Sequence, residues 1–269
     1  MKAKLAAAPY LVWMVLFILV PLGVVVYFAF TTADGAFTLA NINEFAAYLP
    51  VFVRSLLFAA AATVICLLIA YPFSYMLSRM RRNTQRTVQM LVMLPMWMNF
   101  LLRTYAWMTL LENNGLINRF LALFGLGPLQ MVNTSGAVIL GMVYNYLPYM
   151  ILPLYTIMVK IDQSVIEAAE DLGCNTVHMA CKVLIPLSVP GIVAGITMVF
   201  VPSVSTFIIS RMLGGGNNLM MGDLIEMQFL GNSLNYNLGS AMSLVLMVVV
   251  LVCMSITHVL GNEDVEEVM

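Results

Sequence analysis

The chain has 269 residues, of which 62% are hydrophobic and 9% are charged, and its mean hydropathy is +0.95. A soluble domain carries about 25% charged residues, so this composition indicates an all-α polytopic membrane protein without room for a soluble domain. The net charge of −1 excludes the basic surface that nucleic-acid binding requires. No glycine-rich loop ending in Lys and Ser or Thr occurs in the sequence, so we expect this chain to have no ATPase site and to be no enzyme.

Six apolar runs are each about 20 residues long, which is the length of an α-helix that crosses a bilayer. They lie at about 9–30, 55–78, 88–111, 134–159, 187–210 and 237–260. The first run is too long for the apolar core of a signal peptide, so it is expected to remain as a span. The sequence therefore predicts a single transmembrane domain over residues 1–269 with six membrane helices.

Lys and Arg are unevenly distributed between the loops, and the richer side is expected to face the cytoplasm. Placing the N-terminus inside assigns eight of them to the cytoplasm and three to the outside. The inside set is Lys2, Lys4, Arg79, Arg81, Arg82, Arg86, Lys160 and Lys182, and the outside set is Arg54, Arg119 and Arg211. This count predicts that both termini are cytoplasmic.

A polar segment at 160–186 separates the fourth span from the fifth, and we call it the coupling island. Ser164 and Glu167 have the spacing of a capping box, which predicts that a helix starts at Ser164. Gly173 is suited to end that helix in a left-handed conformation. The island is therefore expected to begin with one short helix closed by a glycine turn.

A second helix is expected in the same island. Asn175 is a suitable N-cap for it, and Pro186 is expected to stop it where the membrane run resumes. Ala168 and Ala169 leave one flank of the island shallow, which favours close contact with another protein.

The order of these residues resembles the cytoplasmic signature of ABC importer permeases. That signature is Glu-Ala-Ala, three residues, Gly, nine residues and Ile-x-Leu-Pro, and here Val183 and Ile185 replace the Ile and the Leu. The resemblance implies a type I ABC importer permease fold in which the island is a coupling helix that fits a cleft on a separate ATPase. The coupling residues that it implies are Glu167, Ala168, Ala169, Gly173 and Pro186.

Four further stretches, at 94–99, 103–105, 113–118 and 213–219, resemble permeases of the spermidine/putrescine (PotB-type) family. This resemblance implies polyamine uptake by alternating access across a bacterial plasma membrane. It implies a second permease subunit of the PotC type, two ATPase subunits that use ATP and Mg²⁺, and an extracytoplasmic polyamine-binding protein. It implies no cofactor and no metal bound by this chain itself.

Polar and aromatic residues at mid-depth in the spans are candidates for the substrate path. A polar side chain that faces lipid costs a few kcal/mol, so these side chains should face a neighbouring helix or an aqueous path. Aromatic faces attract ammonium groups, and carboxylates on the outer side are suited to the charged ends of a polyamine. The candidates are Trp97, Asn99, Tyr144, Asn145, Tyr146, Tyr149, Ser203, Ser205, Asp223 and Glu226.

Alternatives remain open at this stage. Asn99 and Asn145 are also suited to bridging helices, the aromatic residues to packing, and Arg103 has the wrong charge for a cation path. The importer is alternatively specific for ferric iron, a phosphonate or another organic cation. A stand-alone channel or secondary transporter would not explain the island, and an enzyme would need clustered catalytic groups, whereas the only histidines are His178 and His258.

Four features predict how the helices and loops pack. The spacing of Gly191 and Gly195 favours close approach of another helix. Pro148 and Pro153 in the fourth span free backbone carbonyls, so that span should face the interior of the bundle or a cavity. Apolar residues in the loop at about 112–133 predict an amphipathic helix at the outer membrane surface, and the loop at about 211–236 predicts a short segment against the bundle.

Overall fold

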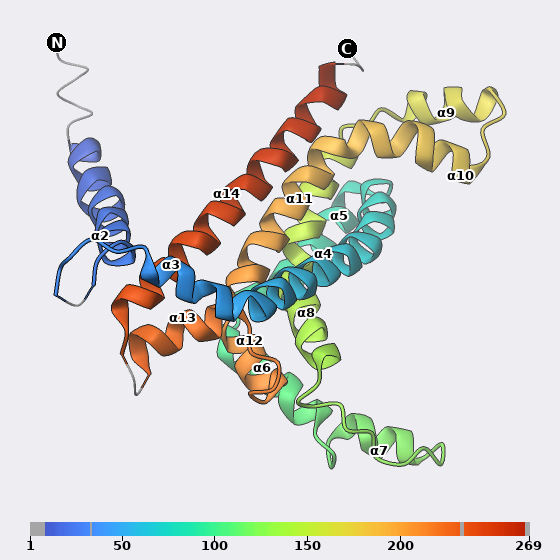
Figure 1. Cartoon of the computed structure of the whole chain (residues 1–269). Helices are drawn as coiled ribbons and strands as arrows, with labels where there is room; N and C mark the ends of the chain where they lie inside the picture. The colour runs from blue at the N-terminus through green and yellow to red at the C-terminus, as the bar shows by residue number, and fades with distance from the viewer. Residues whose placement is uncertain (1–8, 33, 232–233, 267–269) are drawn as a thin grey trace, which may run out of the picture.

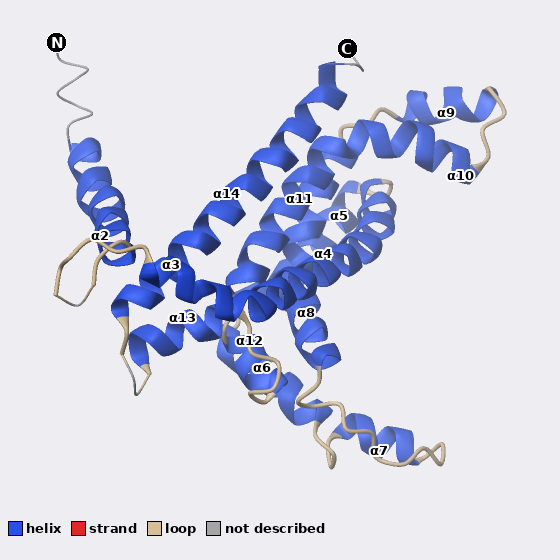
Figure 2. Ribbon diagram, viewed as in Figure 1, coloured by secondary structure: helices blue, strands red, loops and turns tan. Residues whose placement is uncertain are grey.

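The structure, a computed structural model, describes residues 9–32, 34–231 and 234–266. Within them it is helical, apart from loops and an isolated bridge between Thr31 and Phe37 (Figure 2). In chain order (Figure 1) the helices are η1 (Val15–Leu19), α2 (Val20–Ala29), α3 (Ala40–Phe45), η2 (Ala46–Tyr48), α4 (Leu49–Ser78), α5 (Arg82–Met93), η3 (Leu94–Trp97), α6 (Phe100–Leu111), α7 (Leu116–Ala122), α8 (Ser135–Met158), α9 (Gln163–Asp171), α10 (Thr176–Met179), η4 (Ala180–Leu184), α11 (Ile185–Ser205), α12 (Ile208–Gly214), α13 (Met221–Leu230) and α14 (Tyr236–Glu266). Lys2 and Lys4, which contributed to the predicted orientation, lie outside the described residues.

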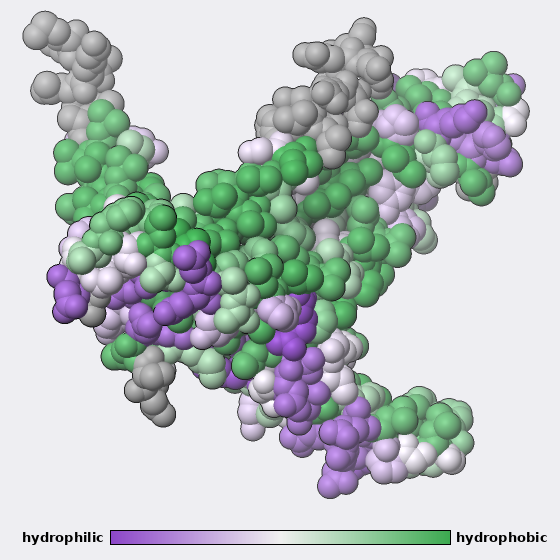
Figure 3. Space-filling model, in the orientation of Figure 1, coloured by the Kyte–Doolittle hydropathy of each residue, from purple (hydrophilic) through white to green (hydrophobic). Residues whose placement is uncertain are grey.

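Five helical runs in the described part are long and apolar enough to cross a membrane. They are Pro9–Ala29, Ala40–Ser78, Ser135–Met158, Val177–Ser205 and Tyr236–Thr257. Each corresponds to a predicted span. Figure 3 shows apolar side chains over α14 and α2, with polar side chains gathered over the coupling island and around the opposite end of the bundle. This distribution is that of a protein surrounded by lipid at mid-height.

The prediction of one continuous helix at 88–111 is wrong. α5 ends at Met93, and the 3-10 turn that follows contains Pro95, which has no backbone N–H for a helical ladder. Asn99 then starts α6, because its Oδ1 accepts a hydrogen bond from Leu101 N at 2.8 Å. Proline and a strong N-cap therefore divide a run whose hydropathy alone suggested one span.

α8 is packed against α4 and α11 at the centre of the bundle. In its most apolar window 56% of the residues are buried, the highest share among the five runs, which confirms that the fourth predicted span faces the interior. α4 meets α8 through small buried residues such as Ala62, Ala70 and Ser74. The Ser74 hydroxyl donates to the Ile151 carbonyl oxygen at 3.2 Å, so the contact is both close and polar.

The contact between α8 and α11 depends on glycine. A Cβ at Gly195 would lie 2.5 Å from Met150 Sδ, and one at Gly191 would lie 3.2 Å from the Pro153 carbonyl oxygen. These distances confirm the close approach predicted from the spacing of the two glycines. α8 and α11 therefore pack with their backbones near one another.

A second apolar cluster joins the remaining outer elements. Phe45, Met221 and Met242 are buried together where α3, α13 and α14 meet. This packing confirms that the 211–236 segment is folded against the bundle. Asn237 Nδ2 donates to the Thr31 carbonyl oxygen at 2.6 Å, which ties the start of α14 to the end of the first span.

Candidate coupling surface and transport path

The first helix of the coupling island is capped by Asp162. Its Oδ1 accepts a hydrogen bond from Ser164 N at 3.1 Å, and this bond lowers the pKa of the Asp162 carboxyl below its ordinary value. The predicted capping box of Ser164 and Glu167 is therefore wrong. The physical reason is that a carboxylate is the stronger acceptor and stands earlier in the chain, so α9 begins there.

Gly173 closes the C-terminal end of α9, as predicted, two residues after the last helical residue, Asp171. Gly173 has φ +80°, its N–H donates to the Glu170 carbonyl oxygen at 2.8 Å, and Cys174 N donates to the Ala169 carbonyl oxygen at 3.0 Å. These two bonds define a Schellman motif. A Cβ at Gly173 would meet nothing within 4 Å, so glycine is required for the backbone conformation and not for space.

The second helix of the island continues into the membrane. Asn175 Oδ1 accepts from His178 N at 2.8 Å, which confirms the predicted cap. The expectation that this helix stops near Pro186 is wrong, because the helix runs without interruption from Val177 to Ser205. The π-helical turn η4 ends at Leu184, two residues before Pro186. Its wider turn accommodates a proline ring that would clash with the preceding turn of a regular α-helix.

The island has a small core of its own. Ile166 and Met179 are buried against Leu184, so α9 folds back onto the helix that leads into α11. Arg79, at the end of α4, fixes the start of the island because its Nη1 donates to the Ile161 carbonyl oxygen and to Gln163 Oε1, both at 3.3 Å. The island is thus a packed extension of the core helices.

The outer surface of the island combines apolar and acidic side chains. Leu172 is 85% exposed and Val177 is 69% exposed, and Glu167 and Ala168 are also exposed. Ala169 differs from the other predicted coupling residues because it is 7% exposed and faces inward. The shallow flank is therefore formed by Ala168 alone, beside two exposed apolar side chains.

Several path candidates have contacts within the bundle. Asn145 Nδ2 donates to the Gly141 carbonyl oxygen at 2.8 Å, and the Tyr146 hydroxyl donates to the Pro202 carbonyl oxygen at 3.3 Å. The Ser203 hydroxyl donates to Val199 within its own helix at 2.6 Å, and the Tyr144 ring packs on Trp107 with a centroid distance of 5.3 Å. Together with the capping role of Asn99, these contacts give most of the mid-depth candidates a structural role.

Other candidates remain accessible. Trp97 is 84% exposed and Tyr149 is 40% exposed, and Ser205 is exposed as well. Between α8 and α11, a cavity of about 400 Å³ is lined by Thr156 and Met198. Thr156 lies seven residues after Tyr149 on α8, and Met198 lies seven residues before Ser205 on α11, so each pair shares one face of its own helix.

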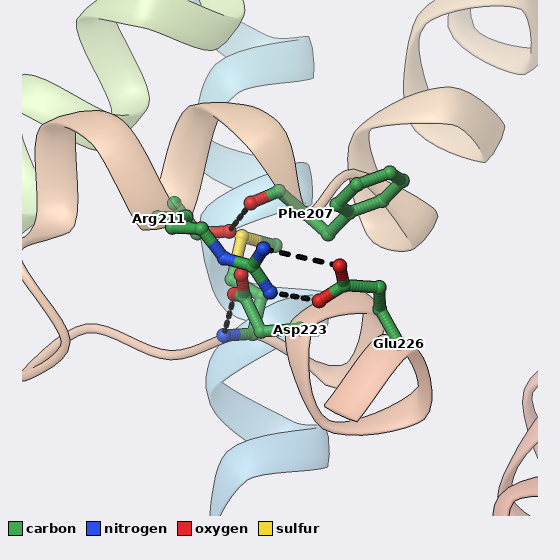
Figure 4. Close-up of polar contacts among 6 residues, drawn as sticks. Phe207, Arg211, Asp223 and Glu226 are labelled. Carbon is green, nitrogen blue, oxygen red and sulfur yellow. Dashed lines mark hydrogen bonds and ion pairs between the residues drawn. The ribbon is translucent and has the colours of Figure 1, made fainter. Parts of the chain in front are cut away.

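The predicted carboxylates lie in structural contacts on α13 (Figure 4). Asp223 is fully buried, and its Oδ2 accepts from Met220 N at 2.8 Å. Burial raises the pKa of this carboxyl. Arg211 pairs with both carboxylate oxygens of Glu226. Each carboxylate therefore has a protein partner, while Oδ1 of Asp223 is buried without a hydrogen-bond partner. The role of both carboxylates toward substrate stays a prediction.

Sequence reasoning missed the role of Arg54 and Ser55. Arg54 Nη1 donates to the Asn217 carbonyl oxygen at 3.2 Å, and Met221 N donates to Ser55 Oγ at 2.7 Å. These bonds hold the glycine-rich segment 214–220 against the start of α4. The only signal in the sequence is a polar pair at the start of the apolar run 55–78.

The fold is a multi-pass helical bundle whose core helices extend into a capped, partly apolar island, which is the architecture of a polytopic membrane protein. Residues 3–262 match the model of the family described as "Binding-protein-dependent transport system inner membrane component", and the chain belongs to this family. It is therefore a multi-pass inner-membrane permease subunit of an ABC importer, whose ATPase and substrate-binding protein are separate chains.

Curated relatives include the spermidine/putrescine transport system permease protein PotB of Haemophilus influenzae, which is 38% identical over 251 residues, 90% of this chain and 87% of the relative. The protein of the same name from Escherichia coli is 36% identical over 247 residues, 88% of this chain and 90% of the relative.

Two solved structures share the fold. A bacterial ABC transporter involved in the import of the acidic polysaccharide alginate superposes with a TM-score of 0.77 at 16% identity, covering 97% of this chain and 95% of that chain. The bacterial alginate transporter in complex with an alginate pentasaccharide-bound periplasmic protein gives a TM-score of 0.71 at 16% identity, covering 95% and 92%. The helical arrangement is therefore that of an ABC importer permease.

Proposed function

We propose that this chain is a permease subunit of an ABC importer for polyamines of the spermidine and putrescine class. The observation that carries the proposal is the 38% and 36% identity to spermidine/putrescine permeases over 90% and 88% of the chain. The importer works by alternating access, with both termini in the cytoplasm and a PotC-type chain as second permease.

The coupling island transmits the movement of the ATPase. Support comes from the exposed Leu172 and Val177, which are suited to a hydrophobic cleft, and from the continuous helix Val177–Ser205. A partner that holds the island therefore holds the end of a membrane helix, and no flexible linker would absorb its displacement.

The α8 and α11 face that carries Tyr149 and Ser205 is the proposed substrate path. A polyamine combines an aliphatic chain with ammonium groups, and an aromatic ring together with apolar neighbours suits both parts. Met198 and Thr156 continue this face toward the cytoplasmic island. Trp97, at the break before α6, supplies a second accessible aromatic ring.

Reconstitution tests both levels of the proposal. The chain is placed in proteoliposomes with its second permease, ATPase and binding protein, and ATPase rate and labelled polyamine uptake are measured while spermidine or putrescine is titrated. Ferric iron, a phosphonate and butylamine, which has one amine, serve as alternative solutes. Tyr149→Ala and Trp97→Ala are compared with Trp13→Ala, which removes an exposed tryptophan from the first span.

Stimulation by polyamines but not by butylamine supports the substrate class. If the binding protein stimulates the ATPase with ferric iron or a phosphonate and not with polyamines, the proposed substrate class is wrong, while the proposal that the chain is an importer subunit stands. If no ATPase assembles with the wild-type chain, the coupling role of the island is refuted.

A further inference from the structure

A cavity lies at the end of the bundle opposite the coupling island. It has a volume of about 500 Å³, is open to the surface and is bordered by the end of α6 and the start of α7, with Thr109 and Leu110 on one side and Leu116 on the other. Since α8 runs from Ser135 here to Met158 beside the island, this cavity belongs to the far membrane surface. In Figure 1, α7 projects away from the bundle on the side opposite α9 and α10. The volume is in the range of small-molecule sites.

The walls of this cavity are held in place by Asn118. Its side chain is 3% exposed; Nδ2 donates to the carbonyl oxygens of Glu112 at 3.1 Å and Leu129 at 3.0 Å, and Oδ1 accepts from Leu129 N at 2.9 Å. A Cβ at Gly115 would lie 2.5 Å from the Leu110 carbonyl oxygen, so the turn from α6 to α7 is also tight. The walls of the cavity, formed by the end of α6 and the start of α7, are therefore fixed before any ligand binds.

Two opposite charges line the cavity without pairing with each other. Glu112 and Arg119 are both among its lining residues, yet the salt bridge found among the described residues joins a different pair, Arg211 and Glu226. Arg119 Nε donates to the Asn114 carbonyl oxygen at 3.1 Å, which leaves its two terminal nitrogens for another acceptor. A ligand that carries one anionic and one cationic group would complement both walls.

The face of α7 beside this cavity is apolar. Leu116 and Phe120 on α7, and Leu123 and Phe124 in the turn directly after it, are all exposed and follow the spacing of one helical face. The two phenylalanine rings pack edge to face with a centroid distance of 5.2 Å. An apolar face next to charged groups at the end of a membrane bundle matches an amphipathic segment in the lipid interface. A ligand suited to both surfaces would have acyl chains as well as a zwitterionic head.

We propose that this cavity binds the headgroup of a zwitterionic phospholipid, phosphatidylethanolamine, in the leaflet opposite the coupling island. The Arg119 guanidinium donates hydrogen bonds to the phosphate oxygens in a forked geometry, and the primary ammonium group donates to the Glu112 carboxylate. The acyl chains lie against Leu116 and the exposed face of α7. Phosphatidylglycerol offers Glu112 no cation, and phosphatidylcholine has no N–H to donate to it.

Native mass spectrometry of the assembled importer tests this site. The complex is exchanged into an equimolar mixture of phosphatidylethanolamine, phosphatidylcholine and phosphatidylglycerol with identical acyl chains, and bound lipids are counted. Loss of a hydrogen bond to a charged group costs about 1.5–3 kcal/mol, or roughly a tenfold or greater change in affinity. Glu112→Gln should therefore reduce the ratio of bound phosphatidylethanolamine to bound phosphatidylcholine by about tenfold. Arg119→Gln should weaken retention of all three lipids.

Controls distinguish this site from general changes of charge. Glu44→Gln and Arg82→Gln remove exposed charges elsewhere and should leave the lipid preference as in wild type. Asn118→Ala keeps both charges but removes the bonds that position them, and it should lose the preference while ATPase assembly is retained. Equal retention of the three lipids by wild type, or an unchanged preference in Glu112→Gln, overturns the proposal. A preference seen with the isolated chain but lost on addition of the second permease shows that a protein covers the cavity, and it also overturns the proposal.

Discussion

Replacing Gly173 by valine should detach the ATPase while leaving membrane insertion intact. The residue has φ +80°, and a non-glycine residue in the left-handed region costs about 1–2 kcal/mol, with β-branched side chains at the upper end and asparagine below it. Because a Cβ there meets no atom within 4 Å, the whole effect is conformational. A cost of that size lowers the ratio of correctly formed to altered turns by about 5- to 30-fold.

The assay is co-purification of the ATPase with the tagged permease pair, followed by measurement of the ATPase to permease ratio. The ratio should fall in the order Gly173→Asn, Gly173→Ala, Gly173→Val. Gly125→Val is the matched control, because Gly125 has φ +72° and open space but lies in the loop after α7, at the far end of the bundle. It introduces the same kind of backbone strain without touching the coupling island.

Two results would refute this reasoning. One is a wild-type ATPase ratio for Gly173→Val, since the Schellman turn would then have no part in the docking surface. The other is an equal loss of ATPase for Gly125→Val, which would point to general destabilisation. A uniform loss across the asparagine, alanine and valine variants would indicate a steric requirement imposed by the ATPase and not by the turn.

Three further changes test other parts of the structure. Gly195→Leu should lower the melting temperature, because overpacking against Met150 costs about 1–3 kcal/mol, whereas Gly23→Leu, with nothing within 4 Å, should not. Tyr149→Ala should raise the KM for polyamine uptake about 2- to 5-fold through loss of about 0.5–1 kcal/mol of cation–π attraction; an unchanged KM would remove Tyr149 from the path. Burial raises the pKa of Asp223, so the folded state keeps this proton to higher pH than the unfolded state and stability falls as pH rises from the ordinary value of 3.8. Asp223→Asn should therefore flatten the pH dependence of the melting temperature, and an unaltered profile would contradict the assignment.

The spans could be predicted from hydropathy because lipid imposes a strong and local requirement on about 20 successive residues. The same requirement misled the prediction at 88–111, where Pro95 and Asn99 divide the run into two helices. Their side chains are local signals that a window average removes. A reading that gave the proline and the N-cap more weight than the mean hydropathy would have found the break.

The coupling island was predictable at its glycine and not at its ends. Gly173 was predictable because a left-handed turn residue favours glycine. Asp162 and Ser164 are both suitable N-caps, and which of them starts α9 depends on where α8 ends. The path was less predictable, because an asparagine or tyrosine at mid-depth is equally suited to a bond within the bundle. Only the fold shows that Asn145 bonds to its own helix while Tyr149 remains accessible.

The two corrections in the island have a common mechanical consequence. The chain enters the island from α8 through a turn that Asp162 caps, but it leaves through a helix that continues to Ser205. That helix has 29 residues, which is about 44 Å at 1.5 Å per residue. Its far end packs on α13, where a Cβ at Gly222 would lie 2.5 Å from the Ser205 carbonyl oxygen. If the ATPase displaces the island as proposed, a single helix connects that displacement to the contact with α13, the helix that carries Asp223 and the Glu226 partner of Arg211.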